Sequence, residues 1–109
     1  MQTLIVYNSR DNLDDLVLLA DGLPILLTGI TRVVITINVT VIDSQTSPAA
    51  ITWPQAVTYQ AAAAHAMRFK LGSFAIAPGT YSDCRLVIYD ATSPGGLVWS
   101  DALVVRVKA

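Results

Sequence analysis

The chain contains little charge and no glutamate. Charged residues make up 14% of its 109 residues and apolar residues 53%, with a mean hydropathy of +0.53, whereas ordinary soluble domains are about 25% charged. All eight acidic residues are aspartate, which favours turns and caps over helix interiors. An isolated monomer so poor in charge would be poorly soluble. A well-filled core beneath an alanine-rich surface is one explanation of this composition, and the one we favour is that part of the surface is buried against partner subunits.

The chain also lacks the patterns that mark several function classes. Its seven basic residues are scattered, so no basic stripe can follow a nucleic-acid backbone, and no nucleic-acid partner is expected. Apolar runs such as 16–20 are far shorter than the roughly 20 residues of a membrane-spanning helix, so no membrane partner is expected either. The N-terminus does not read as a secretory signal, and a lone Cys84 cannot form an internal disulfide. Both observations favour synthesis in a reducing cytoplasm.

Residues with catalytic or metal-binding chemistry are few. Asp11, Asp14 and Asp15 lie within five positions, but no glycine-hinged frame of oxygen ligands follows them, so they predict a solvated turn and no metal. Adjacent residues of an extended chain point to opposite faces, which argues against Asp14 and Asp15 as an acid and base pair. The unique His65 and Cys84 could pair as base and nucleophile, yet neither stands near a glycine elbow or an oxyanion motif. We predict no catalytic residue and no cofactor, with Cys84 as a small core residue.

β-Branched residues, in contrast, are abundant. Valine, isoleucine and threonine form over a quarter of the sequence, and they suit strands better than helices. The alternation from Thr31 to Val41 has a period of two and predicts one long strand with one face on a core. The residues predicted to face that core are Val33, Ile35, Ile37, Val39 and Val41.

Shorter strands are predicted along the rest of the chain, and turn-forming residues separate them. These strands are 3–7, 16–20, 51–54, 56–59, 67–71, 81–90 and 97–108, the last with a bulge near 100–101. The alanine-rich stretch 60–66 is the one place where a helical turn is plausible. Seven to eight strands with turn signals about every 8–12 residues predict a single domain, 1–109, that is an all-β, immunoglobulin-like antiparallel sandwich.

Large aromatic side chains in a small sandwich usually anchor its core. Trp53 and Tyr59 flank weaker strand segments, so they are the aromatic residues that we single out as candidate partner contacts, because such residues also dominate interface energetics. For both residues, a role as an anchor of the hydrophobic core is the alternative. Asn38-Val39-Thr40 fits a glycosylation sequon, but it falls inside the predicted long strand and is interpreted as chance.

Several motifs follow one another in a familiar order. Residues 21–29 read Asp-Gly-Leu-Pro-Ile-Leu-Leu-Thr-Gly, the alternating strand follows, and 77–81 and 86–90 read Ala-Pro-Gly-Thr-Tyr and Leu-Val-Ile-Tyr-Asp. This order resembles the immunoglobulin-like domains of tailed-bacteriophage structural proteins, including the N-terminal domain of upper baseplate adaptor proteins, over residues 15–108. Those adaptors continue into further domains, whereas this chain ends at Ala109, and 60–66 replaces a tighter turn. We therefore expect a stand-alone virion subunit.

The resemblance implies a virion structural protein that is made in the host cytoplasm. The leading hypothesis is a minor capsid or decoration subunit that self-associates as a homo-oligomer and stabilises the assembled shell by binding the major capsid protein. A first alternative is a tail baseplate or fibre adaptor subunit. A second alternative is a carbohydrate- or receptor-binding sandwich that displays Trp53 and Tyr59 for stacking on sugar rings, because one fold can host many functions.

Overall fold

Strands form nearly all of the regular structure, which confirms the all-β class expected from the composition. The computed structural model describes residues 2–10, 12–17, 19–20, 23–24, 27, 29–54, 66–82, 84–98 and 103–108. In chain order the strands are β1 (Gln2–Tyr7), β2 (Asp14–Val17), β3 (Leu19–Ala20), β4 (Leu23–Pro24), β5 (Ile30–Ile37), β6 (Thr40–Asp43), β7 (Ile51–Thr52), β8 (Ala66–Phe69), β9 (Gly79–Tyr81), β10 (Arg85–Asp90), β11 (Leu97–Val98) and β12 (Leu103–Lys108). A short 3₁₀ helix, η1, spans Gly72–Phe74.

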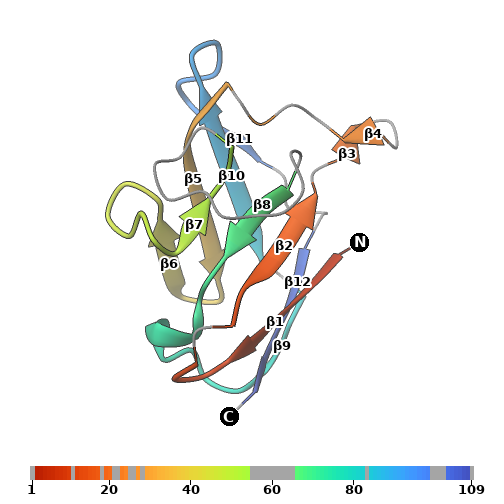
Figure 1. The fold of residues 1–109 in the computed structure, drawn as a ribbon, viewed down its shortest axis with the longest axis vertical. Helices are drawn as coiled ribbons and strands as arrows, with labels where there is room; N and C mark the ends of the chain where they lie inside the picture. The colour runs from red at the N-terminus through yellow and green to blue at the C-terminus, as the bar shows by residue number, and fades with distance from the viewer. Residues whose placement is uncertain are drawn as a thin grey trace.

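The strands are arranged in two facing layers (Figure 1). One layer is the antiparallel sheet β2-β8-β7, and the other is the antiparallel sheet β11-β10-β5-β6 behind it. A third sheet, β1-β12-β9, pairs β1 and β12 in parallel and β12 and β9 antiparallel. β3 and β4 form a separate two-stranded ribbon. The two facing antiparallel layers make the protein a β-sandwich.

The hydrophobic core lies between these layers. Leu16, Met67 and Phe69 contribute from the first layer, and Ile35 and Leu86 from the second, each at most 1% exposed. Burial of an aliphatic or aromatic side chain of this size stabilises a fold by about 1.5–3 kcal/mol. Because buried residues from β1 through β12 belong to one contiguous cluster, a single core holds all three sheets together.

The segment predicted as one long strand, Thr31–Val41, is a hairpin, so that prediction was wrong. β5 ends at Ile37 and β6 begins at Thr40, and these two residues are paired across the hairpin. Asn38, the first residue of the two-residue turn, has a φ of 56°. Asparagine adopts this left-handed conformation more readily than most residues, which is why the chain can reverse here without a glycine.

The turn also changes which residues face the core. Ile37 and Thr40 lie opposite each other and share a face, so inward positions are odd-numbered before the turn and even-numbered after it. Val39 and Val41, predicted to point inward, are 85% and 62% exposed, whereas Ile42 is buried. The glycosylation sequon that begins at Asn38 therefore stands at the tip of a hairpin and not inside a strand.

The other strand predictions agree with the described residues. β1 covers the predicted strand 3–7, β7 covers only the first two residues of the predicted strand 51–54, and the predicted inward residues of 67–71 are all buried. Three predicted strands are divided in two: 16–20 contributes to β2 and β3, 81–90 to β9 and β10, and 97–108 to β11 and β12. The strand predicted at 56–59 and the bulge near 100–101 fall outside the described residues, as does all of the helical turn predicted at 60–66 except Ala66, which begins β8.

Candidate functional site

The aspartate side chains of β2 make hydrogen bonds within the fold. Asp14 Oδ2 accepts a hydrogen bond of 3.2 Å from the amide of Ile5, which ties β2 to β1, and partial burial raises the pKa of Asp14. Asp15 accepts two hydrogen bonds from Arg68, at 2.7 and 3.2 Å. The two carboxylates thus have separate partners, while Asp11 lies outside the described residues. Within the part of the chain that the structure describes, no group of histidine, cysteine and acidic residues is placed to hold a metal.

Cys84 is a core residue, as predicted. Its side chain is 2% exposed, and its Sγ donates a hydrogen bond of 3.3 Å to the carbonyl of Tyr81. His65, the other half of the base and nucleophile pair considered from the sequence, lies outside the described residues. Among the described residues, no helix is long and apolar enough to cross a membrane.

Trp53 lies in the core and not on the surface. Its side chain is 5% exposed, and its Nε1 donates a hydrogen bond of 2.9 Å to the carbonyl of Ile30. The indole therefore takes the core role that the sequence left open, and it offers little surface for a partner or a sugar ring. Tyr59 and Trp99 lie outside the described residues, so a partner contact through Tyr59 stays a prediction.

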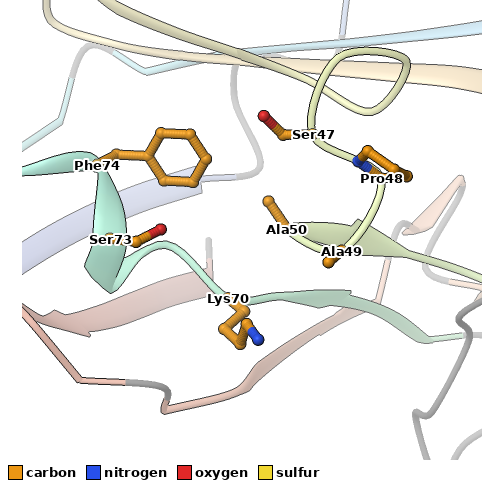
Figure 2. Close-up of a pocket in the computed structure, with 7 residues that line it drawn as sticks. All are labelled: Ser47, Pro48, Ala49, Ala50, Lys70, Ser73 and Phe74. Atoms are coloured by element: carbon orange, nitrogen blue, oxygen red, sulfur yellow. The ribbon is translucent and has the colours of Figure 1, made fainter.

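A shallow groove runs between the loop before β7 and the segment that follows β8. Its volume is about 480 Å³, and it is lined by Ser47, Pro48, Ala49, Ala50, Lys70, Ser73 and Phe74. Figure 2 shows the Phe74 ring on one side of the groove and Ser47 on the other, with the Lys70 ammonium turned away from the ring. Its polar groups point in different directions, whereas small-molecule sites have polar groups that converge on the ligand.

The exposed side of the sheet β11-β10-β5-β6 is a better candidate for binding. We call it the outer face, because Val33, Ile35 and Ile37 point from the opposite side of β5 into the core. Strand register places nine side chains on it. They are Arg32, Val34, Thr36, Val41, Asp43, Arg85, Val87, Tyr89 and Val98.

Three valines form a row across the middle of the outer face. Val98 pairs with Val87, and Val87 pairs with Val34, and Val98 is 58% exposed. The absence of a side chain at Gly96 leaves room for the side chains of Val87 and Tyr89. A Cβ atom at Gly96 would lie 2.6 Å from Val87 Cγ1 and 2.9 Å from Tyr89 Cε2. Gly96 also has a φ of +87°, a conformation that side-chain-bearing residues rarely adopt.

Charged groups surround this valine row: Arg32 and Arg85 lie on its two sides, and Asp43, which pairs with Val34, lies at its end on β6. Arg32 donates a hydrogen bond of 3.1 Å from Nε to Asp43 Oδ1 and a second, shorter one from its terminal nitrogen to Oδ2, and its guanidinium lies 4.9 Å from the centroid of the Tyr89 ring. These hydrogen bonds hold the pKa of Asp43 below its usual value and raise the pKa of Arg32. Beyond the row, Arg85 is exposed and pairs with Thr36.

The outer face could not be predicted from the sequence, for a physical reason. Val41 was predicted to be buried, and the positions of Val87 and Val98 relative to Val34 depend on strand register, which one sequence does not reveal. The one local signal was Asn38, a residue that tolerates the left-handed turn. In comparisons of the chain with family models, with curated proteins and with solved structures, no match was found.

Proposed function

We propose that this chain is a structural packing subunit of immunoglobulin-like type, and specifically a minor capsid or decoration protein of a tailed-bacteriophage virion. The observation that carries the proposal is the outer face, where Val41 and Val98 are exposed and Val34 and Val87 are half-buried between them, in a chain with only 14% charged residues. Exposed apolar surface of this kind marks sites of protein contact. Such a subunit acts by mass action, because binding to the assembled shell alone favours the closed shell.

Strand order supports the immunoglobulin-like part of the proposal. The sheet β2-β8-β7 resembles strands B, E and D of that fold, and β6-β5-β10-β11 resembles strands C′, C, F and G, in the same order along the chain. The hydroxyl of Tyr81 donates a hydrogen bond of 2.5 Å to the carbonyl of Ala77. This bond resembles the tyrosine corner, in which a tyrosine near the start of strand F bonds to the backbone a few residues upstream.

The virion assignment rests on the motif order at 21–29, 77–81 and 86–90 together with this strand order. Quantitative mass spectrometry and electron cryo-microscopy of purified particles test it directly. A decoration protein is expected in hundreds of copies on the shell, whereas a handful of copies would place the chain in the tail. Absence from purified particles would overturn both virion locations.

An add-back experiment tests the stabilising role. Shells assembled without the chain are mixed with purified protein, and the temperature at which the shells disrupt is measured. A rise that saturates with protein concentration is expected, because a ligand that binds only the assembled state stabilises that state. If the protein fails to bind these shells, or binds without changing their stability, the decoration role is wrong.

A further inference from the structure

We draw no further inference here: the strongest candidate, the surface patch that Val34, Val87 and Val98 form across the outer face of the sheet β11-β10-β5-β6, carries none because nothing in the structure shows what covers it.

Discussion

Trp53 Nε1 donates a hydrogen bond of 2.9 Å to the carbonyl of Ile30, a residue 23 positions earlier in the chain. Because Trp53 follows β7 and Ile30 begins β5, this bond joins the two layers of the sandwich. Trp53→Phe keeps an aromatic ring but leaves the buried carbonyl without this donor, which we expect to cost about 1–3 kcal/mol. Trp53→Ala should cost about 3–5 kcal/mol because it also leaves a cavity.

Urea denaturation followed by circular dichroism measures both losses, since tryptophan fluorescence would change with the substitution itself. The main prediction is the ranking: Trp53→Ala should lose more stability than Trp53→Phe, and Trp53→Phe more than the wild type. If Trp53→Phe proved as stable as the wild type, the hydrogen bond to Ile30 would contribute nothing to the fold.

Gly72 is expected to tolerate no side chain. A Cβ atom at this position would lie 2.0 Å from the carbonyl oxygen of Arg10 and 2.6 Å from that of Tyr7, and both are backbone atoms that cannot rotate away. Gly72→Ala should therefore destabilise the fold by at least about 1–3 kcal/mol, the usual cost of overpacking. Thermal unfolding by calorimetry measures this change.

Gly29→Ala is the matched control, because no atom lies within 4 Å of a Cβ atom built at Gly29. This substitution should leave stability unchanged or raise it by about 0.4–1 kcal/mol, since alanine restricts the unfolded chain. Equal effects of the two substitutions would contradict the close approach of Gly72 to the segment after β1.

Stability at acid pH is expected to depend on Asp43. The hydrogen bonds from Arg32 lower the folded-state pKa of this carboxyl below its ordinary value of 3.8. A carboxyl with a lowered pKa contributes stability that is fully present above its unfolded-state pKa and is lost as the pH falls through its folded-state pKa. Asp43→Asn should thus lower stability at neutral pH and flatten the loss below about pH 4, as urea denaturation at a series of pH values will show.

Asp14 should behave in the opposite sense. Burial raises the pKa of this carboxyl above 3.8 in the folded state, so the folded protein binds its proton more tightly than the unfolded chain does. Acidification through that raised pKa adds stability, and Asp14→Asn should make the acid-induced loss steeper than in the wild type. A flatter profile in this variant would mean that its hydrogen bond with Ile5 outweighs the effect of burial.

Local patterns in the sequence predicted those parts of the fold that depend on local geometry. The burial of Met67, Phe69 and Leu71 followed from their alternation before Gly72. Contacts between distant segments were not predictable in this way, because they depend on register. The buried Trp53 side chain bonds to a partner 23 residues away, and the valine row of the outer face exists only once β11, β10 and β5 are aligned.

The missed turn at Asn38 shows why alternation of apolar residues alone is insufficient to predict where a strand ends. The two-residue turn shifts the inward positions from odd to even numbers, but the exposed Val39 and Val41 continue the odd-numbered apolar pattern of β5, so the alternation in the sequence runs unbroken across the turn. Neither glycine nor proline marks this turn, and its only signal is an asparagine that tolerates positive φ. The exposed valines after the turn then look like core residues.

Substitutions at Asn38 test this account of the hairpin. Its φ of 56° suits glycine, so Asn38→Gly should leave stability nearly unchanged. Asn38→Val should cost about 1–2 kcal/mol, because a β-branched residue in the left-handed region brings Cβ too close to the following carbonyl oxygen. Val39→Thr, beside it at a position that is 85% exposed, is the control and should have little effect. Urea denaturation of the three variants measures these differences. If Asn38→Val were as stable as Asn38→Gly, the left-handed turn at Asn38 would be contradicted and the prediction of a continuous strand from Thr31 to Val41 would stand.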